Sequence, residues 1–388
     1  MKAVILAAGE GKRLEPLTNL RPKPMLPLAN KPLLDHVMEA VVGAGIEDVI
    51  LVVGYKRQRI QSYFGDGDDW DIDITYAAQE KQLGTGNALL QTEEFIDSDF
   101  VVLNGDRIVD EAILERVIDE RRETGTNQMA VTNAEEPELY GVVTLDEDSM
   151  VTDIREKPPK REIASDLINA GVYAFGPSIF EAIRETTTRG ELGLTDVLDQ
   201  HLDSLPVAGV PYGRTWLDVS RPWDLTTVNG RLLDVNSINT APTASVHPTA
   251  VVSDHAALGA DATVHPNATV LRGTAIGDNV QVGPNATIQN SIVMADARIQ
   301  AGAVIRNAVI GENVTIGPNS TIPGGKSDVV LQDRVHEDVT FGGIVGDNAT
   351  LEGSVTVAPG SFLGNGSTVE LDAHVSGRIE PNADVRRG

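Results

Sequence analysis

Cysteine is absent from the 388 residues of this chain. Its absence excludes disulfide bonds, thiolate metal ligands and a cysteine nucleophile. Long apolar runs are also missing, since none approaches the ~18–20 residues that a membrane-spanning helix needs. The first apolar stretch, Ala3–Ala8, covers only six residues and is more typical of a buried strand than of a signal peptide. We therefore expect a cytoplasmic protein with no membrane partner.

Positive charge is scarce in this sequence. Lysine and arginine total 31 against 57 aspartate and glutamate residues, which gives a net charge of −26. Repulsion from phosphate excludes nucleic acid as a polymeric partner, but it does not exclude a single nucleotide as a substrate. Because salt screens self-repulsion, an acidic and lysine-poor chain favours a halophilic source, with an ordinary acidic cytoplasmic protein as the alternative.

Aromatic residues are nearly absent from the last 149 residues, which contain only Phe341 and Phe362. All three tryptophans and all six tyrosines precede residue 240. A core without aromatic side chains must be filled by small aliphatic ones in a regular arrangement, which favours a repeat. The composition thus predicts two domains, residues 1–239 and residues 240–388.

The second predicted domain repeats an aliphatic residue at every sixth position. The register slips by one residue at Val293 and again at Ile310, stops over 323–338 and resumes at Val339. Glycine and asparagine fall between the repeats, where a corner needs a left-handed backbone angle. This pattern predicts a prism of short parallel strands with one aliphatic side chain pointing inward on each face. The first eight repeat positions are Val246, Val252, Leu258, Val264, Val270, Ile276, Val282 and Ile288.

The first predicted domain alternates strand and helix patterns. Their order predicts βαβ units around a mainly parallel, mixed sheet, which is a Rossmann-like α/β domain. Ligands of such sheets bind beyond the carboxyl ends of the strands. The predicted strands are 2–7, 48–53, 72–77 and 99–103, and the predicted helices are 32–44, 56–64, 86–95 and 111–123.

A glycine-rich turn follows the first strand. Leu6, Ala8, Gly9 and Gly11 allow backbone N–H groups to face an anion, and Arg13 adds a charged fork. The turn matches neither the GxGxxG loop of dinucleotide enzymes nor the Walker A loop. It predicts a nucleotide-binding loop of another kind, although a tight turn alone would also use glycine.

A second basic element, RPKPMLP, begins at Arg21. Prolines on both sides predict that Lys23 lies on a stiff extended segment. Such a segment suits the placement of a single positive charge on phosphates.

These two elements, read as LAAGEGKRLEPLT and RPKPMLPLANKPLL, resemble the opening motif of the sugar nucleotidyltransferases, also called nucleoside-diphosphate-sugar pyrophosphorylases. The resemblance extends over essentially the whole chain, because several subfamilies append a hexapeptide-repeat, left-handed β-helix. It implies an α/β nucleotidyltransferase domain followed by a left-handed parallel β-helix. The implied reaction joins a sugar 1-phosphate to UTP or dTTP and releases pyrophosphate.

The resemblance assigns nucleotide binding to Gln79, Gly84 and Thr85, and a side-chain amide suits the edge of a pyrimidine because it offers a donor and an acceptor. It assigns Mg²⁺ to Asp106, which follows a strand, and to Asp218. Two hard oxygen ligands, completed by substrate phosphates and waters, are a usual way to hold Mg²⁺. Either aspartate by itself is also typical of a turn or a helix N-cap.

The resemblance also implies a sugar pocket. Glu156 would bind sugar hydroxyls and Lys157 the sugar phosphate, with Gly141 and Asn169 as further pocket elements. Gly141 by itself is nearly as typical of a hairpin turn.

The charges of the substrates suggest the mechanism. A sugar phosphate is already an anionic nucleophile, so no general base is required. We expect Arg13, Lys23 and Lys157, together with Mg²⁺, to neutralise the phosphates and align an in-line displacement.

Three roles are open for the predicted β-helix: assembly, regulation or acyl transfer. Similar helices often pack as trimers, so we expect a homo-oligomer. The run GGIVGDNA, from Gly342, resembles the archaeal bifunctional enzymes, which implies acetyl-CoA as a second substrate and glucosamine 1-phosphate as its acceptor. His336, in the interruption of the repeat, is the candidate general base, although a loop histidine is also typical of a purely structural role.

Two alternatives compete with a bifunctional enzyme. One is a glucose-1-phosphate thymidylyl- or uridylyltransferase whose β-helix serves only assembly or regulation. The other is a non-catalytic regulator or scaffold, which the presence of Arg13, Lys23, Asp106, Lys157 and Asp218 disfavours.

Overall fold

A computed structural model describes residues 1–163, 165–188, 190–235, 240–332 and 334–387. The chain packs into two compact units, the first made of Met1–Glu10 and Leu33–Asp218 and the second of Gly11–Pro32 and Val219–Gly388. The predicted domain boundary after residue 239 falls on residues 236–239, outside the described residues, and stays a prediction. No helix among the described residues has the length and apolar character required to cross a bilayer.

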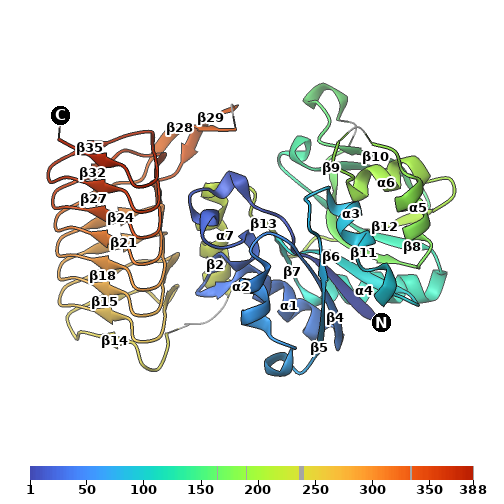
Figure 1. Cartoon of the computed structure of the whole chain (residues 1–388), viewed down its shortest axis with the longest axis horizontal. Helices are drawn as coiled ribbons and strands as arrows, with labels where there is room; N and C mark the ends of the chain where they lie inside the picture. Colours follow the sequence, from blue (N-terminus) through green and yellow to red (C-terminus); the bar gives the residue numbers. More distant parts are fainter. Residues whose placement is uncertain (164, 189, 236–239, 333, 388) are drawn as a thin grey trace. The chain divides into compact units, whose positions relative to one another are not determined.

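The first unit is built on a nine-stranded mixed sheet (Figure 1). Its strand order is β10-β9-β11-β6-β1-β4-β5, with β8 beside β11 and β12 beside β8. Strands β6, β1, β4 and β5 are parallel, which confirms the predicted α/β domain. The strands are β1 (Lys2–Leu6), β4 (Asp48–Val53), β5 (Asp73–Ala78), β6 (Phe100–Asn104), β8 (Asn127–Asn133), β9 (Gly141–Leu145), β10 (Val151–Glu156), β11 (Leu167–Phe175) and β12 (Val207–Pro211).

The helices of this unit follow the predicted order, with one difference. The helix predicted over 86–95 ends at Leu90, and the chain then tightens into a short 3₁₀ turn over Glu93–Phe95. The Thr92 hydroxyl donates to the Leu89 carbonyl, which competes with continuation of the helix. The helices are α1 (Leu33–Gly43), α2 (Arg57–Phe64), α3 (Thr85–Leu90), α4 (Glu111–Thr124), α5 (Ile179–Glu185) and α6 (Leu194–His201).

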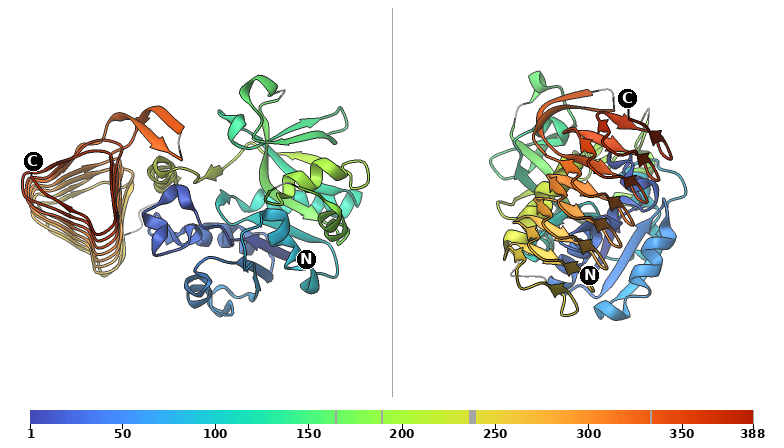
Figure 2. Two further views of the ribbon diagram at one scale, coloured as in Figure 1. Left: turned by 45° about the horizontal axis from the view of Figure 1, so that its top comes forward. Right: turned by 90° about the vertical axis from the view of Figure 1, so that its left-hand side faces the viewer.

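The second unit contains the predicted left-handed β-helix. Its short strands stack into three parallel sheets, and their coils form a triangular prism when seen along the stack (Figure 2). Val264 pairs with Val282, 18 residues on, whereas Ile276 pairs with Val293 and Val293 with Ile310, 17 residues on. The predicted one-residue slips are therefore confirmed.

Each sheet runs the length of the β-helix. The first contains β14 (Ser245–Val246), β17 (Thr263–Val264), β20 (Gln281–Val282), β23 (Arg298–Ile299), β26 (Thr315–Ile316), β31 (Thr350–Leu351), β34 (Thr368–Val369) and β37 (Asp384–Val385). The second contains β15 (Val251–Val252), β18 (Thr269–Val270), β21 (Thr287–Gln289), β24 (Val304–Arg306), β27 (Thr321–Ile322), β32 (Thr356–Val357) and β35 (His374–Val375). The third contains β16 (Ala256–Leu258), β19 (Thr274–Ile276), β22 (Ile292–Val293), β25 (Ala308–Ile310), β30 (Gly343–Val345), β33 (Ser361–Leu363) and β36 (Arg378–Ile379).

The corners of the β-helix use asparagine and glycine for different reasons. Asn279 and Asn313 adopt the left-handed conformation, with φ of 58° and 54°. Gly277 instead lies under the next coil, because an added Cβ would come within 2.8 Å of the Ala295 nitrogen. Asparagine therefore supplies the turn angle and glycine permits close stacking of the coils.

The interruption of the repeat is an antiparallel hairpin. Strands β28 (Lys326–Leu331) and β29 (Arg334–Thr340) project from the stack, as predicted for an inserted loop (Figure 1). The prediction that the repeat resumes at Val339 is wrong, because Val339 pairs with Ser327 inside this hairpin and the coil resumes at β30. Val339 is aliphatic in the expected phase, but an alternating strand pattern gives the same signal.

Two short ladders and one helix lie outside these sheets. In the first unit, β7 (Arg107–Val109) pairs antiparallel with β13 (Trp216–Asp218). In the second unit, α7 (Pro222–Val235) contacts the third sheet of the β-helix and the two-stranded ladder of β2 (Pro27–Leu28) and β3 (Lys31–Pro32).

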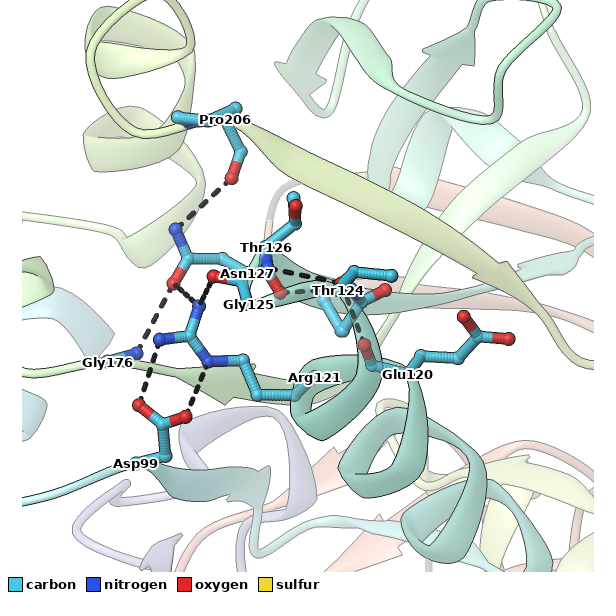
Figure 3. Close-up of polar contacts among 10 residues, drawn as sticks. Asp99, Glu120, Arg121, Thr124, Gly125, Thr126, Asn127, Gly176 and Pro206 are labelled. Atoms are coloured by element: carbon cyan, nitrogen blue, oxygen red, sulfur yellow. Dashed lines mark hydrogen bonds and ion pairs between the residues drawn. The ribbon is translucent and has the colours of Figure 1, made fainter.

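Arg121 joins the end of α4 to four other segments (Figure 3). Its guanidinium donates to both carboxylate oxygens of Asp99, at 2.9 and 2.8 Å, and to the Gly125 carbonyl at 2.5 Å. The amide of Asn127 extends this network to Pro206 and Gly176. The Arg121 side chain is only 12% exposed and Asp99 is 37% exposed, so the bidentate pair is partly shielded from solvent.

We expect Arg121→Ala to lower the free energy of unfolding by about 1–3 kcal/mol, because it leaves the buried Asn127 amide oxygen and the partly buried Asp99 carboxylate without this donor. Arg122→Ala is the matched control, since Arg122 is 62% exposed and its pair with Asp119 is 3.7 Å long. That change should stay within about 0.5 kcal/mol. Denaturant titration followed by circular dichroism measures both, and equal effects would contradict the assigned network.

Candidate active site

The carboxyl ends of the parallel strands bring the predicted nucleotide loop together with the predicted metal loop. The Leu6 carbonyl, at the end of β1, accepts a hydrogen bond of 2.9 Å from the Gly105 N–H, which follows β6. The Ala7 N–H donates to the Val52 carbonyl of β4 at 2.9 Å. Ala8 is buried and Gly9 exposed, so the turn leaves the sheet at Gly9.

A cavity of about 560 Å³ lies at this edge of the sheet. Its size falls in the range of small-molecule sites. Three basic side chains line it, those of Lys56, Arg57 and Lys81, although Arg57 is already paired with Glu80 at 2.7 Å. The remaining lining residues are Glu10, Gly54, Tyr55, Gln58, Gln79 and Gln82.

Gln79 is held in one orientation next to this cavity. Its amide nitrogen donates to the Gly84 carbonyl and to the Asn87 side-chain oxygen, both at 3.0 Å. Both amide hydrogens are therefore used, and no described residue is seen to donate to the amide oxygen, which can accept from a ligand. Gln82 donates to the Ala8 carbonyl at 2.9 Å and so ties this segment to the glycine-rich turn.

Gly84 and Thr85 pack against a distant part of the chain. Gly84 has φ of +98°, and an added Cβ would come within 2.4 Å of the Leu192 carbonyl oxygen. The Thr85 hydroxyl accepts from the Leu194 N–H at 2.9 Å. Both residues thus anchor the start of α3 beside α6.

The two predicted metal ligands lie on adjacent segments. Asp106 directly precedes β7, and Asp218 ends β13, where it is paired with Arg107. The Asp218 side chain is 5% exposed and accepts a hydrogen bond of 3.2 Å from the Tyr140 hydroxyl. The structure therefore gathers the two carboxylates around one arginine.

Arg107 is a site residue that the sequence reasoning missed. Its guanidinium lies 3.9 Å from an Asp218 oxygen and 5.6 Å from the ring centroids of both Tyr140 and Trp216. Burial lowers the pKa of Arg107, but the carboxylates of Asp218 and Asp106 outweigh burial and raise it overall. The only signal in the sequence was an arginine directly after the aspartate of Asn-Gly-Asp.

The two carboxylates fit a Mg²⁺ site that substrate completes. Among the residues described, no cluster of three or more His, Cys, Asp or Glu side chains could hold a metal ion unaided. Mg²⁺ commonly takes one or two carboxylates and keeps waters and phosphate oxygens as its other ligands. The carboxylates of Asp106 and Asp218 match this coordination preference of Mg²⁺.

The predicted sugar-pocket residues converge at the start of β9. Glu156 pairs with Gly141 across β10 and β9, and an added Gly141 Cβ would lie 3.3 Å from the Glu156 carboxylate and 3.7 Å from the Asn169 Cβ. Lys157 is 2.7 Å from the other Glu156 oxygen and half exposed. Thr195, which the sequence reasoning did not include, donates to Glu156 at 3.1 Å.

Asn169 connects this group of residues to Arg107. Its carbonyl accepts from the Arg107 guanidinium at 2.9 Å, and its side-chain nitrogen donates to the Tyr173 hydroxyl. Burial raises the pKa of Tyr173 to about 12, although the hydrogen bond with Asn169 and the charge of Arg107 lower it. The phenol therefore stays protonated and neutral at physiological pH.

Gly11, Arg13, Lys23 and His336 belong to the second compact unit. Gly11 has φ of +71°, and an added Cβ would lie 2.7 Å from the Lys23 Cβ, so the turn closes onto that lysine. Arg13 donates to the Gln332 side chain of the hairpin at 2.8 Å. The extended conformation predicted for Lys23 is wrong, because Lys23 begins a 3₁₀ turn, which a proline in the first turn of a helix tolerates.

His336 packs against an aromatic side chain. Its ring centroid lies 5.1 Å from that of Trp223, at the start of α7, in an edge-to-face arrangement. The contact fixes the hairpin on α7 within the second unit.

Gly171, on β11, makes room for Arg107. It has φ of +80°, and an added Cβ would approach the Asn104 amide nitrogen to 2.6 Å and an Arg107 nitrogen to 2.8 Å. The pairing of β11 with β8 shifts register here, between Asn169 and Tyr173.

We expect Gly171→Ala to lower the free energy of unfolding by about 1–3 kcal/mol more than Gly125→Ala. Gly125 shares the left-handed φ, at +70°, but an added Cβ there meets open space. The difference between the two variants thus isolates the steric displacement of Arg107 and Asn104. Chemical denaturation measures it, and equal losses would contradict the crowding.

Comparison with known proteins identifies relatives of both parts. The sequence profile described as nucleotidyl transferase matches residues 2–235, and the profile described as GMPPB C-terminal domain matches residues 254–358. The bifunctional protein GlmU of Methanococcus maripaludis is 40% identical over 236 residues, which is 60% of this chain and 55% of that protein. This chain thus spans only about half the length of that relative.

Two other relatives match over more of their own length. The low-salt glycan biosynthesis nucleotidyltransferase Agl11 of Haloferax volcanii is 35% identical over 252 residues, 63% of this chain and 70% of that protein. The glucose-1-phosphate thymidylyltransferase of Streptomyces antibioticus is 36% identical over 240 residues, 60% of this chain and 67% of that protein.

Solved structures agree with the fold of the first part. A putative glucose-1-phosphate thymidylyltransferase from Bacillus anthracis, solved with sucrose, has a TM-score of 0.56 and 27% identity over 61% of this chain and 96% of its own. A UDP-glucose pyrophosphorylase with UDP-glucose has the same TM-score at 23% identity, covering 61% of this chain and 99% of its own, and supports the fold alone.

Proposed function

The chain belongs to the nucleotidyl transferase family, and from that membership we propose that it transfers a nucleotidyl group from UTP or dTTP to a sugar 1-phosphate, releasing pyrophosphate. One observation carries the proposal: Arg107 joins the Asp106–Asp218 pair to the Asn169 strand at the end of the parallel sheet. A pair of carboxylates beside a pocket with Glu156 and Lys157 suits phosphates on one side and a sugar on the other.

The proposed step is a displacement at the α-phosphorus. An oxygen of the sugar phosphate forms the new bond to this phosphorus, and the bond to the bridging oxygen of pyrophosphate breaks, so pyrophosphate leaves with that electron pair. No proton needs to be removed from the nucleophile. The task for the protein is to bring two anions together, which positioned charges accomplish.

Each cationic group has a proposed role in binding or neutralising the phosphates. Mg²⁺ on Asp106 and Asp218, when bound, would neutralise phosphate oxygens as a Lewis acid. Lys157 would bind the sugar phosphate, because its ammonium lies beside Glu156, which suits the sugar hydroxyls. We assign phosphate binding to Arg13 and Lys23 on the strength of the family motif.

The fixed amide of Gln79 supports a preference for uracil or thymine. The free amide oxygen is a hydrogen-bond acceptor, and these two bases present an N3–H donor where cytosine presents a lone pair. A mispaired acceptor in a buried contact loses more than the bond itself, because it leaves two lone pairs facing each other.

We expect Asn87→Ala to reduce discrimination between UTP and CTP by about tenfold, since the Gln79 amide can then rotate to present its donors. Gln91→Ala is the matched control, because Gln91 donates to the Asn87 backbone carbonyl and leaves the Asn87 side chain in place. Pyrophosphate release with each nucleotide gives the ratio of kcat/KM. An unchanged ratio in Asn87→Ala would contradict the orienting role.

We expect Lys23→Ala and Lys157→Ala to lower turnover by orders of magnitude while the unfolding midpoint stays near that of the wild type. Lys160→Ala is the control, since Lys160 is 79% exposed and paired with Glu138. Unchanged turnover in both lysine variants would refute the assignment.

The substrates are identified by a separate panel. Pyrophosphate release is measured for UTP, dTTP, CTP and GTP with glucose, glucosamine and N-acetylglucosamine 1-phosphates, in low and high salt.

Narrower proposals concern the β-helix and the source. Acetyl transfer from acetyl-CoA with His336 as base draws support from the word bifunctional in the name of the GlmU relative. Thiol release with glucosamine 1-phosphate tests it, and His336→Phe keeps the aromatic contact with Trp223 as a structural control. The proposal of a trimer rests on the hexapeptide repeat. The proposal that the protein comes from the cytoplasm of a halophile rests on the acidic composition.

A further inference from the structure

The segment Gly11–Pro32, which carries Arg13 and Lys23, packs in the same compact unit as the β-helix. Apart from three short 3₁₀ turns, it has only the two-residue strands β2 and β3, so few of its backbone groups are fixed by regular structure. A chain segment of this kind needs outside partners to hold one conformation. Those partners lie on one corner of the β-helix.

This corner, which we call the Asp347 corner, follows the third strand of each coil. Its residues come two positions after the end of β19, β25, β30 and β33, at Asp278, Glu312, Asp347 and Asn365 respectively. The polar side chains cap the neighbouring coil: Asp278 accepts from the Ala260 N–H, and Asp347 accepts from the Glu312 N–H, both at 2.7 Å.

Arg21 inserts into the Asp347 corner. Its guanidinium is 2.9 Å from an Asp347 oxygen and 3.0 Å from a Glu312 oxygen, and it also donates to the Leu17 carbonyl within its own segment. Arg21 is 2% exposed and Asp347 is 1% exposed. Burial raises the pKa of Asp347, while the charge and hydrogen bond of Arg21 oppose that rise. A buried pair of this kind is costly to break from one side, because the remaining charge is left without compensation.

Further bonds hold the segment on either side of Arg21. The Asn365 side chain donates to the Pro16 carbonyl at 3.2 Å, and the Asn30 side chain donates to the Ile276 carbonyl at 2.8 Å. Asn229 of α7 adds a bridge, accepting from the Ala29 N–H and donating to the Gly273 carbonyl, both at 2.8 Å. The segment is thus attached from Pro16 to Asn30 along several coils.

We propose that the β-helix acts in nucleotidyl transfer itself, with Asp347 as a positioning residue that holds Arg21 and, through it, the segment bearing Arg13 and Lys23. This inference rests on the proposed function. Its physical basis is that Arg21 lies two residues before Lys23 and packs its guanidinium on the Leu17 carbonyl, so loss of its anchor loosens the backbone between the two basic residues. A displacement of about 1 Å in such groups can cost up to ~100-fold in rate.

The test compares full-length variants at the same corner position. Asp347→Ala removes the anchor of Arg21 and one capping bond. Asp278→Ala removes the equivalent capping bond from an exposed residue that pairs with no arginine in the part of the chain that the structure describes. We expect Asp347→Ala to lower kcat by about 10–100-fold with the KM for sugar 1-phosphate unchanged, and Asp278→Ala to stay within about twofold of the wild type.

Two more variants keep the test decisive if Asp347→Ala disturbs the coil. Arg21→Met removes the anchor without altering the β-helix, and we expect a similar fall in kcat. Asp347→Asn retains the acceptor for Arg21 and Glu312, and we expect it to recover most of the lost turnover. Wild-type turnover in Arg21→Met, or equal losses in Asp347→Ala and Asp278→Ala, would overturn the inference.

Hydrogen exchange gives a readout that does not depend on activity. We expect peptides within residues 11–32 to exchange faster in Asp347→Ala and Arg21→Met, while peptides of the β-helix core stay protected as in Asp278→Ala. Unchanged exchange in residues 11–32 would refute the anchoring. A wild-type chain that releases no pyrophosphate with any substrate pair would instead refute the proposed function, and exchange would still decide whether Asp347 orders the segment.

Discussion

A parallel sheet ends all of its strands on the same edge, and the first unit of this protein depends on that constraint. Strands β1, β4, β5 and β6 deliver four loops to one edge, each from a different part of the sequence. The Leu6–Gly105 hydrogen bond then ties the loop after β6 to the end of β1, and the Ala7–Val52 bond ties the loop after β1 to β4. Because main-chain bonds set these positions, the side chains at the edge need little further support to be held in place.

The net charge of the chain is negative, but two of its arginines are buried with carboxylates. The chain carries 26 more acidic than basic groups, yet Arg107 and Arg21 are largely shielded from solvent. Arg107 is enclosed by two aromatic rings and two carboxylates, and Arg21 by Asp347 and Glu312. A buried guanidinium needs compensating negative charge, and both arginines find a carboxylate distant in sequence, Asp218 for Arg107 and Asp347 for Arg21.

The sequence supported the fold class and the family well, because both leave local signals. Short stretches of sequence were enough to identify the alternating βαβ pattern, the six-residue repeat with its two slips and the motif LAAGEGKRLEPLT. The structure confirms the first two, and the profile match confirms the family. Gly141, Glu156 and Asn169 were assigned to one pocket from the resemblance, and the structure brings them together.

What could not be predicted depends on contacts across long separations. Nothing near Arg21 in the sequence indicates Asp347, which lies 326 residues away, and nothing near Gln79 identifies which amide atoms remain free. At Val339 a local signal exists but is ambiguous. An aliphatic residue in this position suits a hairpin strand and a β-helix strand equally, so the pattern cannot distinguish them.

The regularity of the β-helix gives it a property that an irregular loop cannot have. Most successive coils repeat the same backbone position after 17 or 18 residues, and the coil that carries the hairpin does so after 35, so polar side chains at one corner form a column. The segment 11–32 is nearly the reverse, with short turns, five prolines and few main-chain bonds of its own. The segment is held in one conformation because it bonds to the fixed groups of the β-helix. These bonds, at Pro16, Arg21 and Asn30, are spread along the segment. In this protein the repeat therefore supplies rigidity where the basic residues of the motif have little of their own.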